Sequence, residues 1–192
     1  MAKPTKPISR FPVPEPETLP ADIREVVDAN TAKAGFTPNV FLAYGYKPDH
    51  FRAFFHYYET LMKGPSGLSR AEREMIVVAV SRINSCTYCT VAHGAALRIL
   101  SKDPYLADQI SANYRLADLT PRQRAMLDFA VKVTERSAEI DQADFETLRG
   151  HGFTESDIWD IGAVAAFFSL SNRMANLADM KPNEEFYTMG RG

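Results

Sequence analysis

Two cysteines, Cys86 and Cys89, stand three residues apart, and His93 follows four residues after the second one. Spacings of three and four residues place side chains on one face of a helix, so both thiols and the imidazole would lie together. One thiol can attack a peroxide oxygen, and the other can condense with the sulfenic acid that results. A neutral imidazole can accept the thiol proton. The pattern predicts a two-thiol redox site.

The cysteine pair stands at the start of an apolar helical pattern that continues to about Leu100. Unsatisfied backbone N–H groups and the helix dipole stabilise a thiolate at such a position. Glu74 opens the apolar part of the preceding helix, where a carboxylate without a partner would be costly. We therefore expect Glu74 to orient His93 and to support its charged form.

Helix start and stop patterns recur along the whole chain, with apolar residues at helical spacing between them and no sustained alternation of period two. We predict an all-α fold. Ser69 with Glu72, and Thr154 with Asp157, form capping-box patterns. The expected helices cover residues 21–34, 48–63, 69–83, 86–100, 104–114, 121–136, 142–149 and 154–180, with a short apolar segment at 37–46.

The ends of the chain differ from this helical middle. Residues 1–20 hold half of the twelve prolines and show no periodic pattern, which predicts an extended Pro-rich arm or, alternatively, a disordered tail. We assign residues 21–182 to one helical domain and residues 183–192 to a C-terminal tail. The 192 residues, 45% of them apolar, suffice for one ordinary core.

The last expected helix faintly resembles the stretch from residue 69 to residue 93. A shift of 85 positions lays the first capping box on the second, and Cys86, Cys89 and His93 on Ser171, Met174 and Ala178. An internal duplication would explain this similarity, with reactive groups kept only in the first copy. In the second copy we expect Phe167, Phe168 and Met174 in the core. The pseudo-repeat would allow Asn172 and Arg173 to approach the cysteine site, but we expect them in hydrogen bonds at the surface.

Composition argues against several classes of partner. The chain has 22 basic and 24 acidic residues, a net charge of -2 and no block of like charge, so nothing favours nucleic acid or an anionic membrane. The longest apolar stretch, residues 161–170, has about half the length that a bilayer span requires. Residues 1–20 contain no apolar core of a signal peptide. We expect a soluble, cytoplasmic protein.

The spacing of the four candidate residues resembles one known family. Glu74, eleven residues, Cys86, two residues, Cys89, three residues and His93 reproduce the pattern of the alkyl hydroperoxidase D (AhpD) branch of the carboxymuconolactone decarboxylase superfamily. Residues 72–76 and 84–89 look like the uncharacterised peroxidase-related enzymes of that branch. The resemblance covers roughly residues 21–180. It implies an AhpD-like multi-helix bundle that assembles as a homo-oligomer.

The resemblance also implies roles for single residues. Cys89 would be the peroxidatic cysteine that passes through a sulfenic acid, and Cys86 the resolving cysteine and proton donor. Glu74 and His93 would form the proton relay. Tyr88 departs from the pattern, because the best-known hydroperoxidases carry a second histidine there, so protonation of the leaving group must proceed differently here.

Other interpretations of the cysteine pair remain open. Two thiolates and an imidazole supply three of the four ligands of a zinc site, but no second CxxC or paired histidines follow. Buried cysteines can also be inert parts of a core. A non-enzymatic redox sensor would use the same disulfide to switch a binding surface. A lactone decarboxylase is disfavoured, because the namesake enzymes look different in lacking the CxxC pair.

The sequence therefore predicts a thiol-dependent peroxidase of the antioxidant type. Cys89 attacks a hydroperoxide, Cys86 closes the disulfide, and an external thiol or dithiol reductant reopens it. Neither a bound organic cofactor nor a metal is implied. The aromatic-rich segment at residues 36–62 offers apolar surface for assembly, so we expect at least a dimer.

Overall fold

The computed structural model describes residues 7–191, and within them the regular structure is helical, with no β-strand. The all-α prediction is confirmed for this part of the chain. The α-helices are α1 (Ala21–Ala34), α2 (Asn39–Gly45), α3 (Pro48–Lys63), α4 (Arg70–Ile83), α5 (Thr87–Ser101), α6 (Leu106–Asn113), α7 (Pro121–Glu135), α8 (Gln142–Gly150) and α9 (Glu155–Leu177). Short 3-10 helices are η1 (Pro16–Thr18), η2 (Tyr114–Leu116), η3 (Ser137–Glu139) and η4 (Glu184–Tyr187).

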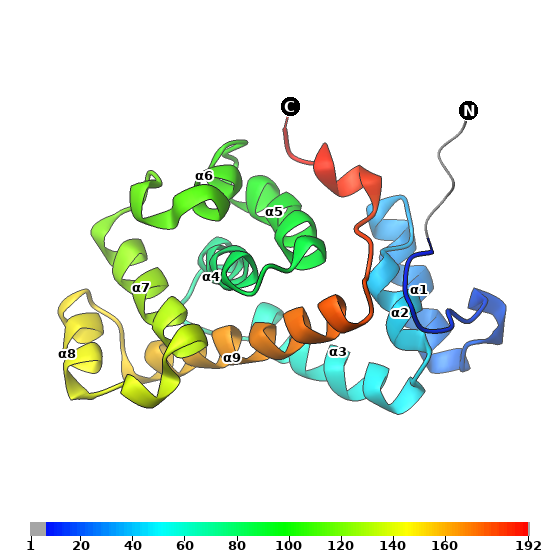
Figure 1. Cartoon of the computed structure of the whole chain (residues 1–192), viewed down its shortest axis with the longest axis horizontal. Helices are drawn as coiled ribbons and strands as arrows, with labels where there is room; N and C mark the ends of the chain where they lie inside the picture. Colours follow the sequence, from blue (N-terminus) through cyan, green and yellow to red (C-terminus); the bar gives the residue numbers. More distant parts are fainter. Residues whose placement is uncertain (1–6, 192) are drawn as a thin grey trace.

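Helix α4 runs through the middle of the molecule, with α5, α6, α7 and α9 packed around it (Figure 1). It begins at a capping box in which the side chains of Ser69 and Glu72 each bond the other's backbone N–H. Residues 75–80 are at most 4% exposed, so α4 is apolar on nearly every side. Burial of each larger side chain contributes roughly 1.5–3 kcal/mol, so this helix is the anchor of the core.

Helix α9 contacts α3, α4, α5 and α7 and forms one long side of the bundle. It begins at the second expected capping box, formed by Thr154 and Asp157. It ends at Leu177, three residues before the predicted end, because Asp179 adopts a left-handed backbone conformation with φ 49°. The residues after α9 therefore leave the helix axis and run beside the N-terminal segment.

Two segments outside the bundle lie against it. The N–H of Arg10 donates to the carbonyl of Ala178 at 2.7 Å, and the N–H of Lys181 donates to the carbonyl of Ile8 at 3.1 Å. Residues 1–6 of the predicted arm and residue 192 of the predicted tail lie outside the described residues. The rest of the tail rests on α5, where the guanidinium of Arg98 donates to two of its carbonyls.

No helix within residues 7–191 has the length and the apolar character that crossing a lipid bilayer would require. The internal duplication and the assembly into oligomers stay predictions.

Candidate active site

A tight turn between α4 and α5 positions the cysteine pair. Ser85 adopts the left-handed backbone conformation with φ 52°, and the N–H of Cys86 donates to the carbonyl of Ser81 at 2.9 Å. This is a Schellman-type helix end with serine at the position where glycine is usual. The side-chain amide of Asn176 on α9 donates to the carbonyl of Asn84 at 3.0 Å. The chain thus reverses, and Cys86 becomes the N-cap of α5.

The two cysteines are free thiols, and they are only 1% and 2% exposed. The N–H of Cys89 donates to Sγ of Cys86 at 3.4 Å. A hydrogen bond from the Cys89 thiol lowers the pKa of Cys86 to about 7, although burial opposes the shift. The same bond, together with burial, raises the pKa of Cys89. Above pH 7 the pair therefore holds one proton on Cys89 and a thiolate at Cys86.

Glu74 and His93 form the second pair of the site. Nδ1 of His93 lies 2.7 Å from Oε2 of Glu74, and their side chains are 15% and 8% exposed. If Nδ1 donates to the carboxylate, Nε2 of a neutral ring is left as an acceptor. The His93 ring also packs edge-on against Phe168, with centroids 4.7 Å apart.

The structure brings the four predicted site residues to the interface of α4 and α5, with one difference from the prediction. We expected His93 to reach the sulfur of Cys89, yet among the described residues no hydrogen bond joins His93 to either sulfur. The imidazole is drawn toward α4 by its bond to Glu74. A proton would have to cross the remaining gap through a water molecule or a substrate oxygen.

Helix α9 supplies two polar residues that the sequence did not assign to the site, although the pseudo-repeat had brought Asn172 into consideration. Ser171 places Oγ 3.9 Å from Sγ of Cys89. Asn172 is fully buried, donates to Oγ of Ser81 at 3.0 Å and accepts from the amide of Asn84 at 3.0 Å. A hydrogen bond from Asn172 also contributes to lowering the pKa of Cys86.

The expectation of a surface position for Asn172 is therefore wrong, whereas Arg173 is exposed as expected. Packing of α9 against the α4–α5 turn covers Asn172, and the local sequence does not reveal that packing. The shift of 85 positions, which lays Ser171 on Cys86, was the one pattern in the sequence that linked α9 to this site.

Two tyrosines flank the cysteines and differ in their hydroxyl groups. The hydroxyl of Tyr88 accepts from the N–H of Val40 at 3.1 Å, so this side chain ties α5 to α2. The ring of Tyr44 stacks on Phe54 with centroids 4.2 Å apart. Its hydroxyl is buried and has no hydrogen-bond partner within residues 7–191. Tyr44 packs against the cluster that contains both cysteines, Tyr88, Ala175, Ala178 and Met180.

A cavity of about 220 Å³ adjoins this cluster, and we call it the thiol-side cavity. Its walls are almost entirely apolar. Residues from α2, the end of α9 and the two outer segments line it: Ser9, Phe11, Ala43, Tyr44, Tyr46, Lys47, His50, Met174, Ala178 and Met180. Met174 is 39% exposed at this cavity, so the expectation that it lies in the core is wrong.

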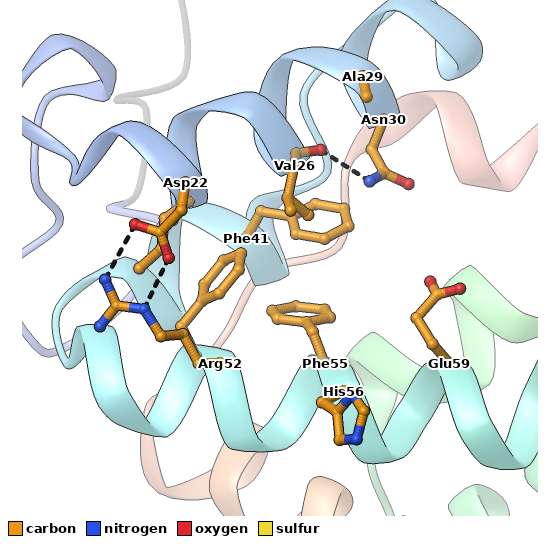
Figure 2. Close-up of a pocket in the computed structure, with 11 residues that line it drawn as sticks. Asp22, Val26, Ala29, Asn30, Phe41, Arg52, Phe55, His56 and Glu59 are labelled. Atoms are coloured by element: carbon orange, nitrogen blue, oxygen red, sulfur yellow. Dashed lines mark hydrogen bonds and ion pairs between the residues drawn. The ribbon is translucent and has the colours of Figure 1, made fainter.

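A larger cavity of about 450 Å³ lies between α1 and α3, and we call it the α1–α3 cavity (Figure 2). Phe41, Phe51 and Phe55 form its aromatic wall. The carboxylate of Asp22 on α1 accepts from two nitrogens of Arg52 on α3, at 2.7 and 3.0 Å. None of the four candidate site residues lines this cavity.

The donor atoms around the cysteines do not form a metal site. Within residues 7–191, no three side chains of His, Cys, Asp or Glu are arranged so that they could hold a metal ion. A structural zinc site needs four ligands in a tetrahedron. The two thiols and the imidazole of His93 do not meet that requirement within the described residues.

Comparisons with known proteins place the chain among its relatives. The model of the carboxymuconolactone decarboxylase family matches residues 48–104, which include all four candidate residues. A protein from Ralstonia eutropha JMP134, described as an alkylhydroperoxidase AhpD core and an uncharacterised peroxidase-related protein, is 59% identical. It covers 97% of this chain and 98% of its own, with a TM-score of 0.96.

Two further structures show the range of the fold. A peroxidase-related protein from Silicibacter sp. TM1040 is 46% identical over 100% of both chains, with a TM-score of 0.93. The debrominase Bmp8 is 17% identical over 95% of both chains with a TM-score of 0.76, a likeness of fold alone. A comparison with curated proteins found no match. The chain belongs to the carboxymuconolactone decarboxylase superfamily and has the AhpD-like fold.

Proposed function

We propose that this protein is a thiol-dependent peroxidase in which Cys89 attacks a hydroperoxide and Cys86 resolves the product as a disulfide. The observation that carries the proposal is the pair of buried free thiols at the start of α5, with the Glu74–His93 hydrogen bond at the same α4–α5 interface. A hydrogen bond between the thiols lowers the pKa of Cys86, which favours the loss of one proton from the pair. The relatives that are 59% and 46% identical are described as peroxidase-related, which supports it.

The first step uses the proton that the two sulfurs share. His93 takes one proton from the reduced pair, and the remaining proton moves from Cys89 to Cys86 across their hydrogen bond. The Cys89 thiolate attacks the outer oxygen of the hydroperoxide, and the O–O bond breaks. Cys89 becomes a sulfenic acid, and the Cys86 thiol protonates the departing alkoxide to give an alcohol.

The second step closes the disulfide. The Cys86 thiolate attacks the sulfur of the Cys89 sulfenic acid, an S–S bond forms and the S–O bond breaks. The departing hydroxide receives the proton that His93 held and leaves as water. The dithiol has then lost two electrons to the peroxide. An external dithiol returns two electrons and two protons by thiol–disulfide exchange.

The experiment measures hydroperoxide consumption by the reduced, metal-free protein with dithiothreitol as the regenerating dithiol, and a protein-free reaction as the blank. We compare the native chain with Cys89→Ser and Cys86→Ser. We expect turnover by the native protein, no reaction in Cys89→Ser, and a trapped sulfenic acid in Cys86→Ser, detected by mass spectrometry.

Two results would count against the proposal. A trapped sulfenic acid in Cys89→Ser, with Cys86→Ser inert, would reverse the two roles. Equal inertness of all three proteins, with stoichiometric zinc in the protein as purified, would replace the redox site with a structural one.

A further inference from the structure

The buried hydroxyl of Tyr44 has no partner, which makes it unusual in this structure. Buried polar groups are almost always hydrogen-bonded, because an unpaired one costs about 1–3 kcal/mol. Within residues 7–191 only three buried side-chain polar atoms lack a partner, and the Tyr44 hydroxyl is the one beside the cysteines. A hydroxyl kept in this state is free to bind a molecule that reaches the sulfurs.

The surroundings of Tyr44 keep its hydroxyl protonated. Burial raises its pKa well above the usual range, and the charges of Cys89 and Cys86 raise it further. The Tyr44 side chain packs against the cluster that contains both sulfurs, so the cysteines and this tyrosine share one apolar environment. Tyr44 is therefore a hydrogen-bond donor at every pH at which the thiols react.

Tyr44 also lines the thiol-side cavity, so one side chain connects the cavity with the sulfurs. At about 220 Å³ this cavity is smaller than the roughly 300–1,000 Å³ of sites for drug-sized ligands. Its apolar walls suit a short alkyl group or a single aromatic ring. Phe11 and Met174 stand at its exposed part, where such a group could enter.

We propose that the Tyr44 hydroxyl donates a hydrogen bond to the hydroperoxide oxygen that leaves as alkoxide, while the small apolar group of an organic hydroperoxide occupies the thiol-side cavity. This inference rests on the proposed peroxidase function. The hydrogen bond stabilises negative charge as the O–O bond breaks, and Cys86 still supplies the proton. Tyr44 then takes over the part that a second histidine would play at the position of Tyr88.

Tyr88 is less suited to this task, although it lies in the same cluster. Its hydroxyl already accepts from the N–H of Val40, which fixes it toward α2. The side chain is 4% exposed, and it does not line the thiol-side cavity. Tyr88 therefore connects α5 with α2, whereas Tyr44 lines the thiol-side cavity.

The first test replaces Tyr44 by phenylalanine, with Tyr57→Phe as the matched control. Tyr57 lies on α3, is 46% exposed and lines neither cavity. We expect Tyr44→Phe to slow sulfenic acid formation with cumene hydroperoxide at least ~10-fold, because one donor to the developing charge is lost. Alkylation by iodoacetamide, which needs no such donor, should stay within twofold of the native rate. Tyr57→Phe should change neither rate.

If Tyr44 had only a structural role, its substitution by phenylalanine would not slow the peroxide reaction selectively. Removal of an unpaired buried hydroxyl stabilises a fold or leaves it unchanged, so Tyr44→Phe should still fold. An unchanged peroxide rate in Tyr44→Phe would overturn the role of the hydroxyl, as would equal slowing of both the peroxide reaction and alkylation. If the native protein reacts with no peroxide at all, the proposed function itself fails, which is a different result.

The second test examines the thiol-side cavity. Met174→Trp places a larger side chain at an exposed position of its wall. We expect it to lower the rate with cumene hydroperoxide at least ~5-fold while the rate with hydrogen peroxide changes less than twofold, since only the organic group needs the space. An unchanged ratio of the two rates would show that the organic group binds elsewhere.

Discussion

The α1–α3 cavity and the thiol-side cavity differ in what they offer to a reacting molecule. The α1–α3 cavity has about twice the volume, but its charged groups, Asp22 and Arg52, already satisfy each other and are 58% and 43% exposed (Figure 2). The thiol-side cavity is small and apolar, and beside it lie two buried thiols and an unpartnered hydroxyl. Buried reactive groups, rather than size, make the surroundings of the thiol-side cavity the candidate active site.

Two histidine substitutions, one at the candidate active site and one at the α1–α3 cavity, should give the largest difference in the rate of peroxide reduction. His93→Phe removes the proton acceptor, so we expect the rate of peroxide reduction to fall about 10²- to 10⁴-fold, as is typical for loss of a general base. His56→Phe at the α1–α3 cavity should leave that rate within twofold. A stopped-flow assay of sulfenic acid formation measures both. Equal losses would show that the α1–α3 cavity belongs to the working site.

The pH dependence of alkylation sharpens the assignment of the thiolate. The folded-state pKa of Cys86 is lowered to about 7, so its thiolate fraction rises as the pH increases through 7 and falls below it. An ordinary thiol, with a pKa of about 8.5, would have a roughly 15-fold smaller thiolate fraction at pH 7 and would be correspondingly less reactive for this reason alone. In native protein we expect the rate of alkylation to rise in one phase with a midpoint near pH 7. Peptide mass spectrometry measures the alkylation. A midpoint near 8.5 would contradict the shared proton.

A change in the α4–α5 turn should alter stability without altering chemistry. Ser85 occupies a left-handed conformation that costs a non-glycine residue about 1–2 kcal/mol, whereas glycine tolerates it at an entropic cost of about 0.5–1 kcal/mol. We therefore expect Ser85→Gly to raise the free energy of unfolding by up to about 1 kcal/mol in urea titrations. A loss of stability would mean that the serine side chain makes a contact that glycine cannot replace.

The smallest effect should come from the ion pair of the α1–α3 cavity. Arg52→Ala removes bonds to Asp22 and Asp49 at the surface. Solvent and salt screen exposed ion pairs, so the free energy of unfolding should fall only slightly, and less at high salt. The peroxide rate should stay within twofold. A tenfold change in that rate would show that the α1–α3 cavity takes part in peroxide reduction.

Local patterns in the sequence correctly predicted the helix starts that are determined by neighbouring residues. The capping boxes at Ser69 and Thr154 begin α4 and α9 as expected, and the start of α5 at the cysteine pair follows from its helical pattern. The end of α9 was misplaced, because the left-handed Asp179 breaks a pattern that still looks helical. Helix boundaries of this kind depend on how the chain continues, so the residue types alone do not reveal them.

The polar surroundings of the cysteines could not be predicted in the same way. Asn172 looked like a surface residue, and it is buried only because α9 packs on the α4–α5 turn. Tyr44 lies in a short segment with weak periodicity. Its unpartnered hydroxyl becomes a candidate functional group only because the fold packs Tyr44 against the cluster of the two cysteines, which are distant in the sequence. Tertiary packing, rather than any local pattern, assembles this part of the site.

The central claim is that the buried thiol pair is oxidised by a hydroperoxide to a disulfide. In the most direct measurement, reduced native protein is mixed with one equivalent of cumene hydroperoxide and quenched in denaturing iodoacetamide. Mass spectrometry then gives the masses of the intact chain and of its peptides. The account predicts a Cys86–Cys89 disulfide that excludes both alkyl groups, with one equivalent of alcohol released. Two alkylated cysteines and unconsumed hydroperoxide would contradict it.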